Sequence, residues 1–141
     1  MFGGRKRRLL FCSMTQEEYN NLSARIIGCA IAVHRQLGPG LFESAYRACL
    51  VHELKRAGMT VQEQVKLPVI YDENRIPKSY VIDMLIEDVI VIEIKAVEEL
   101  SHLHFAQTLT YLKIGDYKLG LVLNFNVRLM KDGIQRLVYR F

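Results

Sequence analysis

Three charged residues lie inside segments that are otherwise apolar. Asp83 interrupts Val-Ile-Asp-Met-Leu-Ile, and Glu93 and Lys95 interrupt Val-Ile-Val-Ile-Glu-Ile-Lys. Burying an unpaired carboxylate is costly, so these charges require partners, a metal ion or water. Two converging carboxylates supply hard oxygen ligands for Mg²⁺ or Mn²⁺, and such an ion activates phosphate and water for hydrolysis. The ammonium of Lys95 suits a role beside the attacking water or the developing phosphate charge.

The pattern alone leaves a second interpretation open: Glu93 and Lys95 form a salt bridge at a strand end, and Asp83 is unrelated. Strand register separates the two interpretations. Glu93 and Lys95 share one face because side chains alternate along a strand. An odd-length loop centred on Asp88 pairs Asp83 with Glu93, whereas a two-residue turn at 87–88 puts Asp83 on the opposite face. A shared metal site therefore predicts the odd register.

A second polar group follows on the next predicted helix. His104, Gln107 and Tyr111 stand at i, i+3 and i+7, so they share one helical face. The functional interpretation places Gln107 and Tyr111 beside the substrate. In the structural interpretation, Tyr111 packs in the core and Gln107 caps an edge.

A third candidate precedes these elements. Glu43 and Tyr46 share one face of a predicted helix. Glu43 falls in the first helical turn, where an acid interacts favourably with the helix dipole and needs no further function. The functional interpretation makes Glu43 an auxiliary acid that serves the metal through water or through a second ion.

These residues resemble known patterns. Asp83, Glu93 and Lys95 resemble the Asp…Glu-x-Lys signature of the PD-(D/E)XK nuclease superfamily, and Gln107-x-x-x-Tyr111 resembles an element of its exonuclease-like branch. Gly40-x-x-Glu43-x-x-Tyr46 resembles the motif of the GxxExxY protein family, a group of small prokaryotic proteins within that superfamily. The similarity extends from about Thr15 to Val138. It includes the segments 34–40, 68–71, 91–97 and 120–125.

The resemblance implies a restriction-endonuclease-like αβββαβ core with an extra N-terminal helix. It implies metal binding by Asp83, Glu93 and the main-chain carbonyl of Ile94. It further implies catalytic roles for four surrounding residues, which are Lys95, Glu43, Gln107 and Tyr111. One departure concerns substrate binding, because relatives often have Arg where this chain has Val81. The absence of this Arg removes one possible contact to phosphate.

Local patterns predict the elements that position these residues. Thr15-Gln-Glu-Glu18 has the spacing of a capping box, and Gly38-Pro39-Gly40 ends the first helix. A β-branched run such as 89–94 is typical of a strand buried on both faces. The predicted helices cover about 15–37, 41–57 and 101–114, and the strands 61–71, 79–86, 89–94, 118–125 and 134–139. This order predicts an α/β (α+β) fold with a mixed sheet flanked by helices.

Composition limits the remaining possibilities. The 141 residues are 50% hydrophobic and 24% charged, which is enough to bury a core. Three Cys without a CxxC pair disfavour a zinc ribbon and suit reduced thiols in the cytoplasm. No apolar run reaches the roughly 18–20 residues of a membrane span.

The positive charge is concentrated in a basic N-terminal extension. Arg5 to Arg8 account for the net charge of +4, since without them the 19 basic residues fall to 15, equal to the 15 acidic ones. We expect residues 1–14 to be disordered and residues 15–141 to form a single domain. The extension is either a phosphate-binding tail or sequence upstream of a start at Met14.

Three functions agree with these features. The first is a Mg²⁺-dependent (or Mn²⁺-dependent) nuclease, a hydrolase that cleaves phosphodiester bonds in DNA or RNA. The second is a catalytically weak or inactive nucleic-acid-binding module on the same fold. The third is a protein-interaction module that forms a homodimer or larger homo-oligomer through apolar surface.

Overall fold

The computed structural model describes residues 14–141, apart from the side chains of Lys78 and Ser79. The predictions for the basic extension therefore concern residues that lie almost entirely outside the described part. The elements follow the predicted order α-α-β-β-β-α-β-β, with one short 3-10 helix added. In chain order they are α2 (Gln16–Leu37), α3 (Glu43–Arg56), β1 (Val61–Tyr71), β2 (Asn74–Ile86), β3 (Ile90–Lys95), α4 (His102–Gly115), β4 (Leu119–Asn124), η1 (Met130–Gly133) and β5 (Ile134–Val138).

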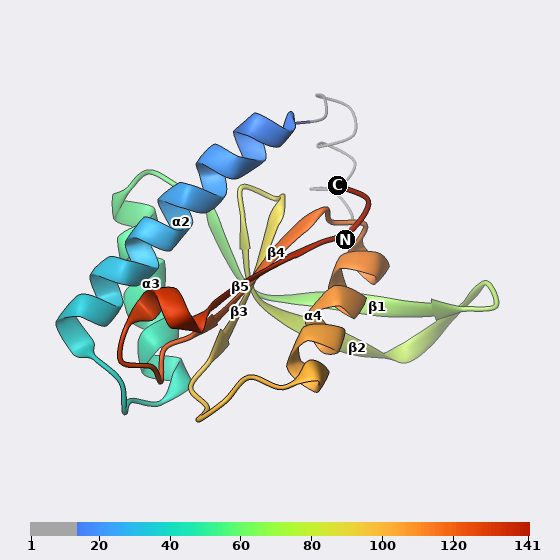
Figure 1. The fold of residues 1–141 in the computed structure, drawn as a ribbon. Coiled ribbons are helices and arrows are strands. Elements are labelled where there is room, and N and C mark those ends of the chain that lie inside the picture. Colours follow the sequence, from blue (N-terminus) through green and yellow to red (C-terminus); the bar gives the residue numbers. More distant parts are fainter. Residues whose placement is uncertain (1–13) are drawn as a thin grey trace.

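The five strands form one mixed sheet in the order β1-β2-β3-β4-β5. Strands β3 and β4 pair in parallel and the other neighbours pair antiparallel. A parallel pair needs a crossover connection, which α4 supplies. Helices α2 and α3 cover one face of the sheet and α4 covers the other (Figure 1). No helix within residues 14–141 combines the length and apolarity needed to cross a bilayer.

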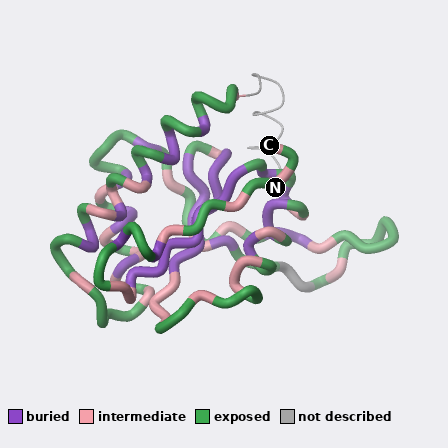
Figure 2. The backbone as a smooth tube through the Cα atoms, in the orientation of Figure 1, coloured by how far each residue is buried: buried purple, intermediate pink, exposed green. Residues whose placement is uncertain are grey.

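Two hydrophobic cores lie on the two faces of the sheet, and buried backbone is concentrated in the strands between them (Figure 2). The first core joins Ile26 of α2 and Leu50 of α3 to Ile92 of β3. The second joins Leu112 of α4 to Val91 of β3. Because the neighbours Val91 and Ile92 enter different cores, β3 is buried on both faces, as its β-branched run predicts.

Local signals set most element boundaries. The capping box at the start of α2 is present, with the Thr15 hydroxyl accepting from Glu18 N–H and the Glu18 carboxylate accepting from Thr15 N–H. Strand β2 is longer than predicted and begins at Asn74 instead of residue 79. Its first residues continue the ladder with β1 to the turn at Asp72 and Glu73, whose φ angles are 51° and 64°. Cross-strand pairing, which polar composition does not reveal, extends this hairpin beyond the body of the protein (Figure 1).

Candidate active site

The predicted register between β2 and β3 is present. The pairs are Met84–Ile92, Leu85–Val91 and Ile86–Ile90, which leaves a three-residue loop centred on Asp88. Continuing this register places Asp83 opposite Glu93. The odd-length loop thus satisfies the condition that a shared site imposes.

The regular strand pairing stops at Asp83 and Glu93, and their side chains replace it. The backbone N–H of Asp83 donates to Glu93 Oε1 at 3.1 Å. The backbone N–H of Ile94 donates to Asp83 Oδ2 at 2.8 Å. Each carboxylate therefore crosses to the other strand, and the two acids are held together by reciprocal hydrogen bonds.

The pleat of β2 changes at the same place. Alternation should put Ile82 and Met84 on one face, yet Ile82 packs in the α4 core and Met84 in the opposite core. The β1 ladder also skips Gln64, which faces this point and has φ 52°. Strand alternation alone does not predict this irregularity, which coincides with the position of Asp83.

Burial of Glu93 perturbs its ionisation. Glu93 is only 5% exposed. Burial, followed by the negative charge of Asp83, raises the pKa of Glu93 from 4.5 to about 8, although Lys95 acts in the opposite direction. At neutral pH Glu93 therefore favours its protonated form, because burial and an adjacent negative charge both disfavour its carboxylate.

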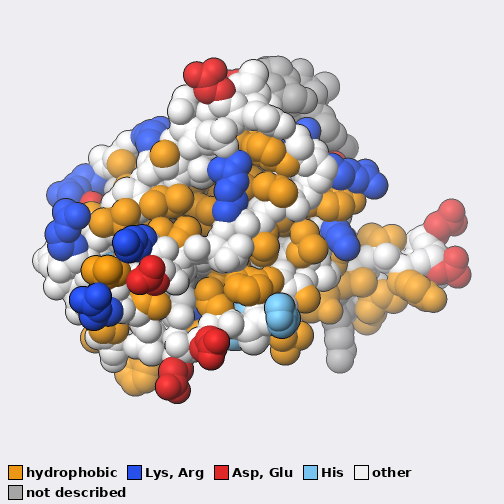
Figure 3. Space-filling model, in the orientation of Figure 1, with side chains coloured by type: hydrophobic (Ala, Val, Ile, Leu, Met, Phe, Trp, Pro, Cys, Tyr) orange, Lys and Arg blue, Asp and Glu red, His pale blue; other side chains and the backbone are white. Residues whose placement is uncertain are grey.

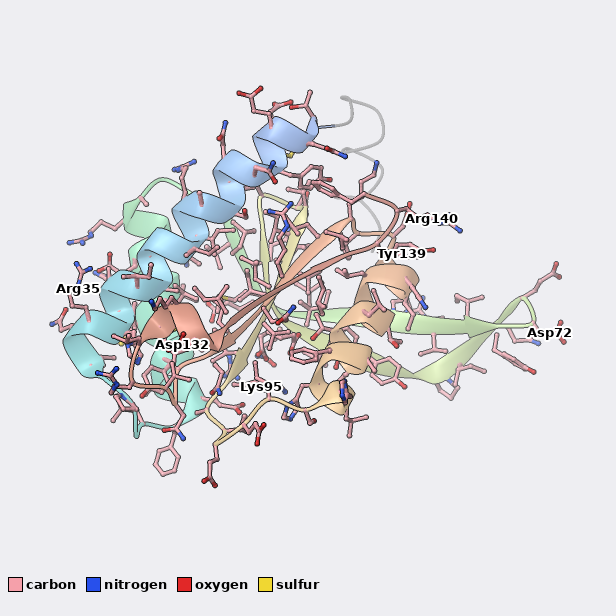
Figure 4. The ribbon with its side chains drawn as sticks, in the orientation of Figure 1. Arg35, Asp72, Lys95, Asp132, Tyr139 and Arg140 are labelled. Carbon is pink, nitrogen blue, oxygen red and sulfur yellow. The ribbon has the colours of Figure 1, made fainter. Side chains whose placement is uncertain are left out.

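The chain that follows Glu93 is fixed by contacts from α3, from β4 and from Phe125, the residue after β4. Lys95 lies where β3 ends and the chain leaves the sheet toward α4 (Figure 4). Its carbonyl accepts from Phe125 N–H at 2.9 Å. The next N–H, of Ala96, donates to Glu43 Oε2 of α3 at 3.2 Å. Buried Asn124 of β4 then bonds both the N–H and the carbonyl of Val97. The backbone that carries Lys95 is thereby preorganised.

Helix α3 contributes a cation that the sequence did not suggest. The Arg47 guanidinium lies with Nη2 3.5 Å from Asp83 Oδ1. Its buried Nε has no hydrogen-bond partner within the described residues. Arg47 follows Glu43 by four residues, so both lie on one helical face. That spacing is the signal that could have identified it.

Helix α4 divides its predicted polar face between the core and the surface. Tyr111 is 4% exposed, and burial together with the charges of Glu93 and Asp83 raises its pKa to about 12. Gln107 is exposed one turn earlier, and its side chain makes no hydrogen bond within the described residues. His104 Nδ1 accepts from Ser101 N–H in the cap of α4. Of these three residues, Tyr111 is the one that is buried and whose pKa the two acids raise.

Tyr46, the last residue of the Gly40-x-x-Glu43-x-x-Tyr46 motif, holds the loop that precedes α3. The side chain is fully buried and its ring stacks on Phe125 with centroids 4.6 Å apart. Its hydroxyl donates to Gly38 O and accepts from Leu41 N–H. Gly40 in that loop has φ 105°, a conformation that favours glycine. Tyr46 thus acts structurally and sets where α3 presents Glu43.

Tyr46→Phe should lower the free energy of unfolding by about 1–3 kcal/mol, because it leaves Gly38 O and Leu41 N–H without their hydroxyl partner. Tyr46→Ala should cost about 3–5 kcal/mol through the added cavity. Urea denaturation measures both values. The control is Tyr71→Phe, at a side chain 73% exposed in the hairpin. A Tyr46→Phe protein as stable as this control would contradict the assignment.

The comparisons with known proteins concern the family of the chain. A family model described as PD-(D/E)XK nuclease superfamily matches residues 20–137. No curated protein and no solved structure matches the chain. The match spans most of the sequence, from α2 through β5. The chain therefore belongs to the PD-(D/E)XK nuclease superfamily.

Proposed function

We propose that this protein is a Mg²⁺- or Mn²⁺-dependent nuclease that hydrolyses phosphodiester bonds in DNA or RNA. The observation that carries the proposal is the pair of carboxylates held side by side, in which Glu93 Oε1 accepts from Asp83 N–H and Asp83 Oδ2 accepts from Ile94 N–H. Such crowding is unfavourable for a purely structural pair, since it raises the pKa of Glu93 and disfavours its charged form. A divalent cation would remove this conflict.

The donor set fits a hard divalent cation. Within residues 14–141, no group of three or more His, Cys, Asp or Glu side chains forms a metal-ligand cluster. Two carboxylates nevertheless suit Mg²⁺, which is usually held by one or two carboxylates, waters and substrate phosphates. Asp83 and Glu93 would hold the ion, together with the carbonyl of Ile94. The bound cation would supply Lewis-acid activation of the phosphate and of the attacking water.

The surrounding residues have separate roles. Lys95 shares the face of Glu93, so its ammonium orients the attacking water or stabilises charge developing on the phosphate. Glu43 is an auxiliary acid, and its bond to Ala96 N–H also keeps Lys95 in place. Tyr111, protonated at neutral pH, donates a hydrogen bond toward the phosphate. Gln107, one turn before Tyr111 on α4, contacts another part of the substrate. Arg47 supplies a phosphate-directed cation in a chain that has Val at position 81.

Incubation of the purified protein with single- and double-stranded DNA and RNA tests the proposal. Cleavage should require Mg²⁺ or Mn²⁺ and should stop with EDTA. Asp83→Asn should remove the activity, whereas Asp132→Asn, in η1 away from the paired acids, should not. If no substrate is cleaved, or if EDTA leaves cleavage intact, metal-dependent hydrolysis by this site is excluded.

Metal affinity should rise with pH. Because Glu93 holds its proton below about pH 8, binding of Mn²⁺ must release that proton. The apparent association constant should increase about tenfold for each pH unit below the pKa of Glu93 and level off above it. Calorimetry at pH 6, 7 and 8.5 in buffers of different ionisation enthalpy measures both the affinity and the released protons. An affinity independent of pH would contradict a site built on Glu93.

A further inference from the structure

A pocket of about 350 Å³ lies between β2 and α4, beside the paired acids. We call it the α4 pocket. Tyr80 of β2 forms one wall, and α4 forms the other with, among others, Leu103, His104, Gln107 and Tyr111. Tyr80 precedes Asp83 by three residues on the same strand, and Tyr111 lies within the field of Asp83 and Glu93. The pocket therefore adjoins the proposed cleavage site.

The lining of this pocket suits a neutral planar group. None of the described lining residues is Lys, Arg, Asp or Glu. The rings of Tyr80 and Tyr111 have centroids 5.6 Å apart at an interplanar angle of 47°. Tyr80 is 44% exposed and Leu103 is 76% exposed, so both offer apolar surface to a ligand. A phosphate would find no cation among these residues, whereas a flat ring would find aromatic and aliphatic faces.

Polar groups at the pocket supply hydrogen bonds for the edge of such a ring. The Gln107 amide, free of bonds within the described residues, offers both a donor and an acceptor. His104 Nδ1 already accepts from Ser101 N–H, so the neutral ring carries its proton on Nε2 as a further donor. Apolar faces combined with a few polar groups are typical of small-ligand pockets.

Resting on the nuclease function proposed above, we propose that the α4 pocket binds one unstacked nucleobase of the substrate. The protein would then act on single-stranded or locally unpaired nucleic acid. A base in an intact duplex is paired and stacked, and can enter such a pocket only after it is extruded. A single strand presents its bases without that cost.

The charge of the folded part gives a second reason for base stacking. Residues 14–141 contain 15 basic and 15 acidic residues, because the four remaining basic residues lie within residues 5–8. On the face drawn in Figure 3, hydrophobic side chains continue from the body onto the β1–β2 hairpin, whose tip carries acidic side chains. The folded part has no net positive charge, so its overall attraction to the phosphate backbone is weak and contacts to bases are expected to contribute to affinity.

Fluorescence anisotropy with labelled oligonucleotides of equal length tests the pocket. The probes are single-stranded DNA and RNA, the DNA duplex, and an abasic strand that keeps the sugar–phosphate backbone. Ca²⁺ and EDTA buffers are used in parallel. Wild type should bind the intact single strand about 5- to 150-fold more tightly than the abasic strand, the range expected for one stacked base. The duplex should bind more weakly than the single strand.

Substitutions at Tyr80 test whether the tighter binding of the intact strand depends on the α4 pocket. Tyr80→Ala should reduce affinity for the intact strand to that for the abasic strand, and Tyr80→Phe should keep wild-type affinity. Tyr71→Ala, at an exposed hairpin tyrosine, is the matched control and should change neither. Circular dichroism verifies folding, and the comparison with the abasic strand needs no variant. Equal binding of intact and abasic strands, or binding of neither, overturns the base pocket.

The cleavage assay separates failure of this proposal from failure of the nuclease function. Cleavage that requires metal and Lys95, together with binding that ignores the bases, rejects the pocket and retains the nuclease. Base-dependent binding without cleavage under any metal condition rejects the nuclease and retains the pocket.

Discussion

Glu93→Gln should abolish Mg²⁺ and Mn²⁺ binding and lower metal-dependent cleavage by about 10³-fold or more, while the protein stays at least as stable as wild type near pH 8. The functional loss follows because an amide carries no charge with which to hold a divalent cation. The structural tolerance follows because Gln resembles the protonated Glu93 that the folded protein favours at neutral pH. Its amide oxygen can still accept from Asp83 N–H.

The pH dependence of the free energy of unfolding shows in which direction Glu93→Gln should change stability. The pKa of Glu93 rises from 4.5 in the unfolded chain to about 8 in the folded protein. Between these values the folded state binds more protons than the unfolded state, so the free energy of unfolding falls as pH increases. The contribution is fully present below the unfolded pKa and is lost as pH rises through the folded pKa. Glu93→Gln removes this dependence.

Urea denaturation of wild type and Glu93→Gln from pH 5 to pH 9 without metal measures the effect. The difference between the two proteins should grow in favour of Glu93→Gln as pH rises toward 8. Mn²⁺ should stabilise wild type increasingly with pH and leave the variant unchanged. A variant that is strongly destabilised at pH 8, or one that still binds Mn²⁺, would refute the role given to Glu93.

Local patterns in the sequence predicted the fold well. A capping box, a glycine-containing loop and a β-branched run act over a few residues, so they determine α2, the start of α3 and β3 without tertiary context. The pairing of Asp83 with Glu93 was also predictable as a condition on loop length. The break in the β2 pleat was not, because it arises where side-chain oxygens replace backbone pairing between two strands.

Residues that act through long-range contacts escaped prediction. Arg47 approaches Asp83 from another layer of the fold, and Asn124 fixes Val97 from a neighbouring strand. Tyr80 forms a pocket with α4 although its own strand gives no such indication. The periodicity of α4 placed Gln107 and Tyr111 on one face correctly. It could not show that Tyr111 is buried and Gln107 exposed, because the sheet covers only part of that face.

Lys95→Ala should lower metal-dependent cleavage by about 10²–10⁴-fold and keep metal binding, since the ammonium acts on water or phosphate and is no metal ligand. The positive charge of Lys95 also lowers the pKa of Glu93. Its removal should therefore shift the pH dependence of Mn²⁺ affinity to higher pH without abolishing binding. Single-turnover cleavage and calorimetry on the same preparations measure these two effects separately.

Lys131→Ala, at an exposed lysine of η1, is the matched control and should behave as wild type in both measurements. Lys95→Arg keeps the charge but not the compact ammonium, so it should leave the pH dependence of Mn²⁺ affinity near that of wild type while recovering cleavage only in part. Wild-type cleavage by Lys95→Ala would remove this residue from the reaction. Loss of metal binding in Lys95→Ala would instead make Lys95 a determinant of the metal site.

The combination of intact metal binding, a shifted pH profile and lost cleavage is expected only of a nuclease. A module that binds nucleic acid without cleaving it would show the pH shift alone, because its Lys95 would still face Glu93 but would have no reaction to support.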